Sequence, residues 1–182
     1  MGLPKKNLKR IGVLGGTFDP PHLGHLEISK FAIKKLNLQF LIWAVTKKNP
    51  LKNKSYFSLQ KRINFSRKLA SKVNKIKIET YDDIIKSSKT INLVKYLKKK
   101  YKKSEIFFLI GSDNLIKFHK WHDWKKISNF CKIIVFPRTG YLKQVFNSKA
   151  YGYLGKEKIQ FIKSKRINIS SSKIRKNYLK YN

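Results

Sequence analysis

Cysteine is almost absent from this sequence, in which Cys131 is the only one among 182 residues. A single thiol excludes an intrachain disulfide framework and a zinc site built from cysteines. Cys131 opens the apolar run 131–136, so we expect a buried thiol with a structural role.

Long apolar runs are also missing. The longest, residues 40–45, has six residues, far fewer than the ~18 that a membrane-spanning helix needs. We therefore expect no membrane partner. The first strand is expected to begin near Lys9, which leaves no room for a leader peptide, so a cytoplasmic location is predicted.

Acidic residues are scarce: nine Asp and Glu stand against 43 Lys and Arg, giving a formal net charge of +34. That charge raises the alternative of a nucleic-acid-binding protein. Only six of the basic residues are arginines, the usual donors to phosphate and guanine, and the lysines are spread along the whole chain. We expect non-specific attraction to polyanions and no specific nucleic-acid partner. The few carboxylates form no sequence cluster that would bind a metal by itself.

The residues that are present are those of a globular protein, with 41% hydrophobic and 13% aromatic side chains. The length suits one domain over residues 1–182, without repeats or linkers. Apolar strand-like runs alternate with helical patterns, the strands being expected at 10–14, 40–45, 75–79, 105–110 and 131–136. This predicts an α/β fold: a doubly wound, mostly parallel, Rossmann-like sheet of about five or six strands with helices on both faces.

Two of the connecting segments need separate comment. The helix expected at 58–71 has Leu59, Ile63, Phe65, Ser66 and Leu69 on its predicted inner face. Residues 142–156 show no clear hydrophobic period, so no secondary structure is predicted for them.

In a sheet of this kind ligands bind beyond the carboxyl ends of the strands.

The most informative stretch is Gly-Gly-Thr-Phe-Asp-Pro-Pro-His-Leu-Gly-His, residues 15–25. It joins the first strand to a helix whose N-terminus offers unpaired N–H groups and partial positive charge to a phosphate. Gly15 and Gly16 allow a ligand to approach the backbone closely. His22 and His25 are three residues apart and so lie on one helix face. A metal-binding histidine pair is the alternative interpretation.

Two further stretches favour phosphate or sugar binding. Near the C-terminus a short strand over 167–169 is expected to lead into a serine-rich cap and a helix carrying Arg175, a second anion site. Gly111 and Asp113 follow the strand 105–110. The Asp113 carboxylate could accept sugar hydroxyls or cap the next helix, and Trp121 and Trp124 could stack on a flat ring or belong to the core.

Together these motifs resemble the nucleotidyltransferase superfamily with the His-x-Gly-His motif. The order of the segments 15–25, 111–115, 138–141 and 169–175 is similar to that of the bacterial nicotinate-nucleotide adenylyltransferases. Phosphopantetheine adenylyltransferases share the first and last motifs and are the alternative. A cytidylyltransferase ending in Arg-x-x-x-Ile-Ser-Thr-Thr is not matched, and a tRNA synthetase would need a Lys-Met-Ser-Lys-Ser loop, whereas Met1 is the only methionine.

The resemblance implies an enzyme that transfers AMP from ATP to nicotinate mononucleotide, with Mg²⁺ carried by ATP as the only cofactor. It leaves the oligomeric state open. The implied catalytic residues are His22, His25 and Arg175. The implied ATP-binding residues are Gly15, Gly16, Thr17, Phe18, His22, His25, Gly111, Asp113, Ser171, Ser172 and Arg175. Those implied for the mononucleotide are Asn49, Lys52, Thr90, Trp121, His122 and Arg138, and Lys89 stands where the family usually has Tyr.

Overall fold

The computed structural model describes residues 8–49, 55–138, 140–163 and 170–178. Its strands are β1 Lys9–Gly16, β2 Phe40–Val45, β3 Ile76–Glu79, β4 Ser104–Gly111, β5 Lys132–Phe136 and β6 Ile159–Phe161. Its helices are α1 Leu23–Lys35, α2 Leu59–Ala70, α3 Thr90–Lys100, α4 Ser112–Lys117, the 3-10 turn η1 Phe118–Lys120, α5 Trp124–Ile127, α6 Leu142–Phe146, α7 Lys149–Lys158 and α8 Ser171–Tyr178.

The strands form one six-stranded sheet in the order β3-β2-β1-β4-β5-β6, and every neighbouring pair is parallel. The chain winds outward from β1 in one direction and from β4 in the other. The strand order therefore reverses between β1 and β4, which is where doubly wound folds bind their ligands. The predicted α/β class, with its Rossmann-like sheet, is confirmed.

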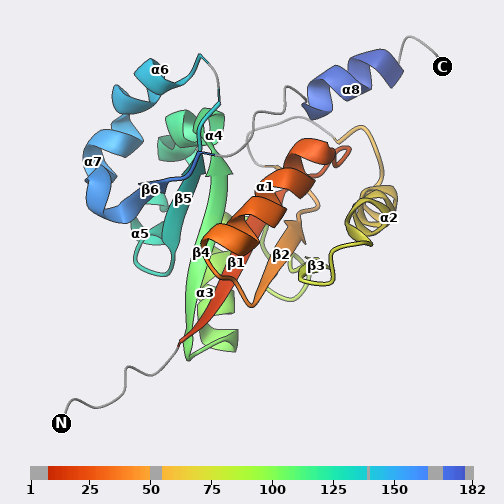
Figure 1. Ribbon diagram of the computed structural model, residues 1–182, viewed down its shortest axis with the longest axis horizontal. Coiled ribbons are helices and arrows are strands. Elements are labelled where there is room, and N and C mark those ends of the chain that lie inside the picture. Colours follow the sequence, from red (N-terminus) through yellow and green to blue (C-terminus); the bar gives the residue numbers. More distant parts are fainter. Residues whose placement is uncertain (1–7, 50–54, 139, 164–169, 179–182) are drawn as a thin grey trace.

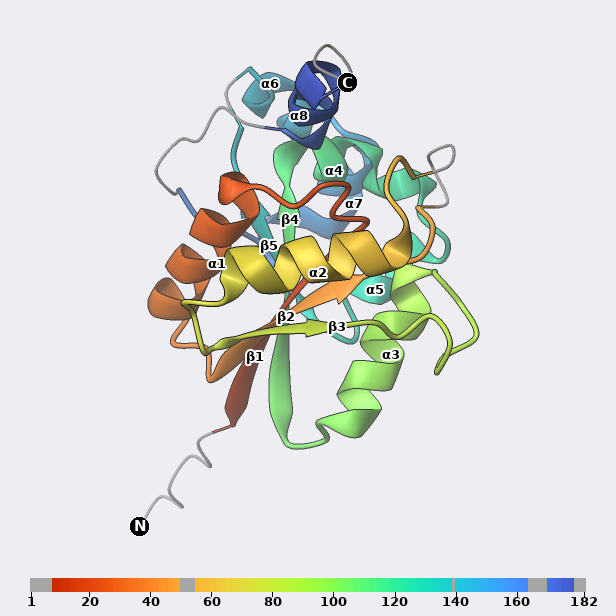
Figure 2. The same ribbon diagram turned by 90° about the vertical axis from the view of Figure 1, so that its right-hand side faces the viewer.

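Alternation along the strands supplies a core on each face of the sheet. Ile11 and Val13 of β1 point to the cluster under α3, α4, α5 and α7, whereas Leu14 points to the cluster under α1 and α2. Figures 1 and 2 show these two helical layers on opposite sides of the strands. Among the described residues no helix is long and apolar enough to cross a membrane.

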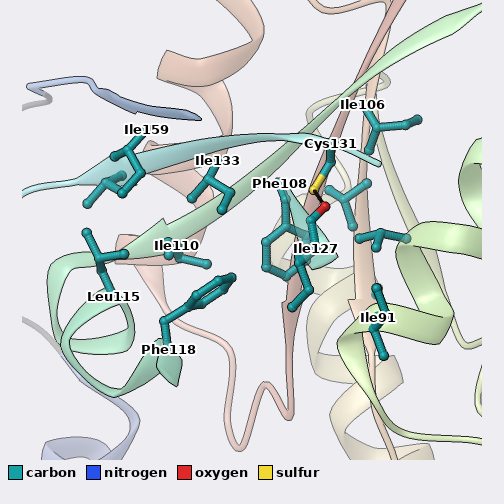
Figure 3. Packing of buried hydrophobic residues seen from close by; sticks show 14 of the residues in the cluster. Ile91, Ile106, Phe108, Ile110, Leu115, Phe118, Ile127, Cys131, Ile133 and Ile159 are labelled. Atoms are coloured by element: carbon teal, nitrogen blue, oxygen red, sulfur yellow. Dashed lines mark hydrogen bonds between the residues drawn. The ribbon is translucent and has the colours of Figure 1, made fainter. Parts of the chain in front are cut away.

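Cys131 belongs to the first of these clusters, as predicted (Figure 3). It is 7% exposed, its Sγ donates to the carbonyl of Ile127 over 3.4 Å, and burial raises the pKa of the thiol to about 12. The thiol is therefore protonated and unreactive at neutral pH.

Three expectations need correction. Gly15, Gly16 and Gly111 are the last residues of strands and not loop residues, because Gly16 pairs with Val45 and Gly111 with Phe136. The unassigned segment contains α6 and most of α7, and β6 follows as a strand that the sequence pattern did not predict.

The third correction concerns α2. Phe65 is 40% exposed and does not line the inner face. The buried positions of this helix are Arg62, Ser66 and Ala70, which recur every four residues. Phe65 lies outside that stripe and packs at the surface against Phe57, with ring centroids 5.4 Å apart.

Candidate functional site

The candidate site lies at the carboxyl ends of the central strands, where β1 leads into α1 and β4 into α4. The two strands are direct neighbours, with Leu14 opposite Leu109. Arg138 joins them from the segment just after the next strand, β5, and its backbone N–H donates to Ser112 Oγ over 2.9 Å. The sheet thus brings together three segments that are far apart in the sequence.

The two histidines lie at the start of α1, where His22 is the N-cap residue and His25 is the third helical residue. Their ring centroids are 3.8 Å apart. The backbone N–H of His22 donates to Nδ1 of His25 over 3.1 Å. Because Nδ1 accepts this bond, a neutral His25 must carry its proton on Nε2 and present it as a donor.

Both imidazoles are neutral at physiological pH. Burial, and next the positive charge of Arg138, lower the pKa of His22 to about 4. Burial, His22 and Arg138 hold the pKa of His25 well below its usual value. The pair therefore offers N–H groups and not positive charge. Within the part of the chain that the structure describes, no group of three or more His, Cys, Asp or Glu side chains is placed to hold a metal ion.

Side chains from β2, α1 and the β1–α1 loop hold His25 in place. Trp43 Nε1 donates to Ser29 Oγ over 2.7 Å, and Ser29 Oγ donates to the carbonyl of His25 over 2.7 Å. The Phe18 ring stacks on Trp43 at 5.0 Å and lies 4.9 Å from the His25 ring. Sequence reasoning missed Ser29 and Trp43, although a serine one turn after His25 on the buried helix face was an available signal.

The second segment predicted to bind an anion contacts the first directly. Ser171 Oγ donates to the carbonyl of Pro20 over 2.9 Å, across 151 positions of sequence. Arg175 donates through Nη1 to the carbonyl of Asp19 and through Nη2 to Ser172 Oγ over 3.2 Å. Figure 1 shows α8 at the same end of the molecule as the N-terminus of α1. The strand predicted at 167–169 lies outside the described residues.

Asp113 does not cap α4, because the N-cap residue of that helix is Gly111 and Asp113 follows in the first turn. Its Oδ2 accepts from Arg138 Nη1 over 3.2 Å. Its Oδ1 is buried without a hydrogen-bond partner, as is Nδ1 of His22, so two of the three such side-chain atoms in the described chain belong to this site. A Cβ added to Gly111 would lie 2.4 Å from Oδ1, so any other residue here would displace the Asp113 carboxylate.

A family model described as cytidylyltransferase-like matches residues 13–177. The chain belongs to this family. A protein of Pelagibacter ubique named "Probable nicotinate-nucleotide adenylyltransferase" is 50% identical over 177 residues, covering 95% of this chain and 98% of that protein. An Aquifex aeolicus protein of the same name is 38% identical, covering 88% of this chain and 98% of that protein. The chain is thus a cytidylyltransferase-like protein of the nicotinate-nucleotide adenylyltransferase group.

The fold has a matching solved structure. A Plasmodium falciparum nicotinic acid mononucleotide adenylyltransferase, complexed with NaAD, superposes with a TM-score of 0.72 at 20% identity, over 92% of this chain and 83% of that one. Identity at this level supports the shared fold and carries no residue assignment.

The residues that the resemblance implies for the mononucleotide lie on several different elements of the fold. Trp121 is half-buried, with its ring 4.8 Å from Phe118, and Trp124 lies 5.2 Å from Tyr153. Both tryptophans pack against the core cluster, as the core alternative predicted, and both are partly buried. The His122 side chain is 55% exposed and lies 3.8 Å from Asp123.

Of the remaining expected residues, Thr90 is the first residue of α3 and follows the N-cap residue Lys89. Asn49 is half-buried in the segment after β2. Asp82 anchors that segment, since its Oδ2 accepts from Thr46 Oγ1 over 2.8 Å and from the backbone N–H of Lys47 over 2.9 Å. Lys52 lies outside the described residues.

Sequence reasoning assigned no role to Asp19 and missed Arg62. Asp19 is 6% exposed, and its carboxylate accepts from the backbone N–H groups of Tyr56 and Phe57 over 2.7 and 2.9 Å. Asp19 therefore ties the family motif to the turn before α2. Arg62 is not among the residues predicted for the inner face of α2, yet it is 2% exposed.

Proposed function

We propose that this protein transfers AMP from ATP to nicotinate mononucleotide, giving nicotinate adenine dinucleotide and pyrophosphate. The observation that carries the proposal is the contact between the two anion-binding segments, in which Ser171 bonds Pro20 and Arg175 bonds Asp19. The two segments then form one composite site that can bind the triphosphate of ATP. The 50% identity to a named adenylyltransferase, along nearly the whole chain, supports the choice of substrates.

The reaction needs no nucleophilic side chain. A phosphate oxygen of the mononucleotide attacks the α-phosphorus of MgATP, a new P–O bond forms, and the bond from the α-phosphorus to the bridging oxygen of pyrophosphate breaks. The protein must align the two reactants and stabilise the negative charge that develops on the leaving group. Mg²⁺ belongs to the substrate MgATP in this proposal and leaves with pyrophosphate.

His22, His25 and Arg175 are the proposed catalytic residues. The Nε2–H group of His25 is available as a donor because Nδ1 is occupied by the backbone of His22. Preorganised neutral donors stabilise developing charge without first having to bind a proton. Ser171, Ser172 and Arg175 hold the β- and γ-phosphates that leave.

The adenylate part of ATP binds along the ends of β1 and β4. Gly15, Gly16, Thr17 and Phe18 line the adenylate and its α-phosphate. The ribose hydroxyls donate to Asp113, whose Oδ1 is buried and unpaired while Oδ2 is engaged by Arg138.

The mononucleotide binds on the other side of the α-phosphate. Trp121 stacks on the pyridine ring, and the backbone at His122 and near Thr90 receives its carboxylate. Arg138 and the segment carrying Asn49 and Lys52 bind its phosphate. We infer a cytoplasmic location as part of the same proposal, since the reaction consumes ATP.

Incubating the purified full chain with ATP, Mg²⁺ and nicotinate mononucleotide tests the proposal. We expect stoichiometric release of pyrophosphate and formation of the dinucleotide, resolved by chromatography. Turnover of phosphopantetheine alone would assign the protein to the other adenylyltransferase class. Specific nucleic-acid binding at physiological salt, without pyrophosphate release from either substrate, would overturn the enzyme assignment.

A further inference from the structure

Arg62 of α2 donates four hydrogen bonds to main-chain carbonyls while being only 2% exposed. Nε donates to Phe57 over 3.1 Å, Nη1 to Thr46 over 2.8 Å and to Thr17, and Nη2 to Lys47 over 3.2 Å. These carbonyls come from three segments: the β1–α1 loop, the segment after β2, and the turn before α2. One guanidinium therefore joins the connections that leave the carboxyl ends of β1 and β2.

Two of the residues that offer these carbonyls are also held, through their own N–H groups, by carboxylates. Lys47 offers its carbonyl to Arg62 and its N–H to Asp82. Phe57 offers its carbonyl to Arg62 and its N–H to Asp19. The charges of Asp19 and Asp82 favour the cationic form of Arg62 and oppose the effect of burial on its pKa. A buried aliphatic side chain would fill this position at lower desolvation cost but could order none of these peptides.

We propose that Arg62 is a positioning residue that sets the separation between the ATP-binding loop at Thr17 and the mononucleotide-binding segment that begins at Thr46. This inference rests on the proposed function, in which these two segments hold the α-phosphate and the attacking phosphate. Transfer between two bound reactants depends steeply on their alignment, and a misplacement of about 1 Å can cost about 100-fold in rate. Arg62 touches neither reactant, so its effect passes through the loops.

Substitution of Arg62 distinguishes a role in positioning the two loops from a role in protein stability alone. Lysine keeps the charge, but its single ammonium cannot reproduce a planar fork of donors to four carbonyls. We expect Arg62→Lys to fold and to lower kcat about 10- to 100-fold. The KM of each substrate should change much less, because each loop keeps its own contacts to its ligand. Arg62→Met should lower kcat at least as far. Arg67→Lys and Arg67→Met, at an exposed position of the same helix, are the matched controls and should retain wild-type kcat.

The measurements are kcat, the two KM values and the calorimetric Kd for ATP alone, taken well below the Tm of every variant. A folded Arg62→Lys enzyme with wild-type kcat and a lowered Tm would make Arg62 purely structural and overturn the proposal. Wild-type protein that does not turn over nicotinate mononucleotide would instead overturn the proposed function.

A second variant covers the case in which substitution of Arg62 prevents folding. Asp82→Asn leaves Arg62 in place and weakens the hold on Thr46 and Lys47 from the opposite side. Since Asp82 is half-buried, we expect this variant to fold. The proposal predicts a kcat lowered about tenfold with an unchanged KM for ATP. An unchanged kcat would overturn it.

Discussion

The backbone N–H of His22 donates to Nδ1 of His25, and this 3.1 Å bond determines which nitrogen of His25 faces outward as a donor. Helical spacing places the two histidines on one face, but it does not specify a tautomer. The bond makes Nε2–H the donor of a neutral His25, and burial together with Arg138 keeps the ring neutral. Each of the four predictions below tests one physical consequence of this site.

Amide substitutions of His25 test the tautomer. Gln places its amide near the position of Nε2 and so retains a donor toward the triphosphate, whereas Asn places its amide near Nδ1 and retains only the acceptor for His22. We expect His25→Asn, like His25→Ala, to lower kcat about 100-fold or more, with smaller changes in KM. His25→Gln should keep a clearly larger share of kcat. Equal losses in the Asn and Gln variants would contradict the assignment of Nε2 as the functional donor.

Stability should fall on acidification because His22 is neutral in the folded state. Its pKa is about 4 when folded and near 6.5 when unfolded, so between these values the unfolded chain binds more protons. The contribution of neutral His22 to the free energy of unfolding is fully present above pH 6.5. It is lost as the pH falls toward 4. We expect the Tm to drop between about pH 7 and about pH 5, and to drop less in His22→Asn, which cannot titrate. Equal drops in the two proteins would show that His22 does not contribute.

Gly111 is expected to strengthen ATP binding by leaving room for the Asp113 carboxylate. A Cβ at this position would meet Oδ1 of Asp113 at 2.4 Å and displace the carboxylate that is proposed to accept the ribose hydroxyls. Gly111→Ala should raise the KM for ATP about tenfold or more, the size expected when a hydrogen bond to a charged group is lost. Gly152→Ala is the matched control, because its Cβ would meet nothing within 4 Å. A normal KM for ATP in Gly111→Ala would argue against the role of Asp113.

Discrimination between the acid and amide forms of the mononucleotide tests the proposed pyridine site. In the proposed site, the carboxylate accepts from backbone N–H groups near Thr90 and His122, and an amide would direct its NH₂ against them. Such a mismatch costs about 1–3 kcal/mol, which corresponds to roughly a 10- to 100-fold preference in kcat/KM for the acid. The measurement is kcat/KM for nicotinate and nicotinamide mononucleotides. Equal values would reject the assignment of the carboxylate pocket and leave adenylyl transfer intact.

Much of the fold could be predicted from the sequence because its signals are local. The continuous apolar runs became β2, β4 and β5, and the buried Cys131 follows from its place in one of them. The family motif at 15–25 required a fixed loop before a helix, and the structure has that loop between β1 and α1. These features depend on backbone preference and on the hydrophobic period over a few residues, which neighbouring residues alone express.

Only the tertiary structure decided which distant groups share an environment. The bond of Ser171 to Pro20 spans 151 positions, and no local pattern specifies it. The neutrality of His22 depends on burial and on Arg138, which lies in the segment after β5. Arg62 was missed and Phe65 was wrongly placed inside, because the hydrophobic pattern of α2 favours burial of an aromatic ring over burial of a charged side chain. The reason is physical: periodicity reports which residues are apolar, whereas main-chain carbonyls gathered from three loops decide where a guanidinium can be buried.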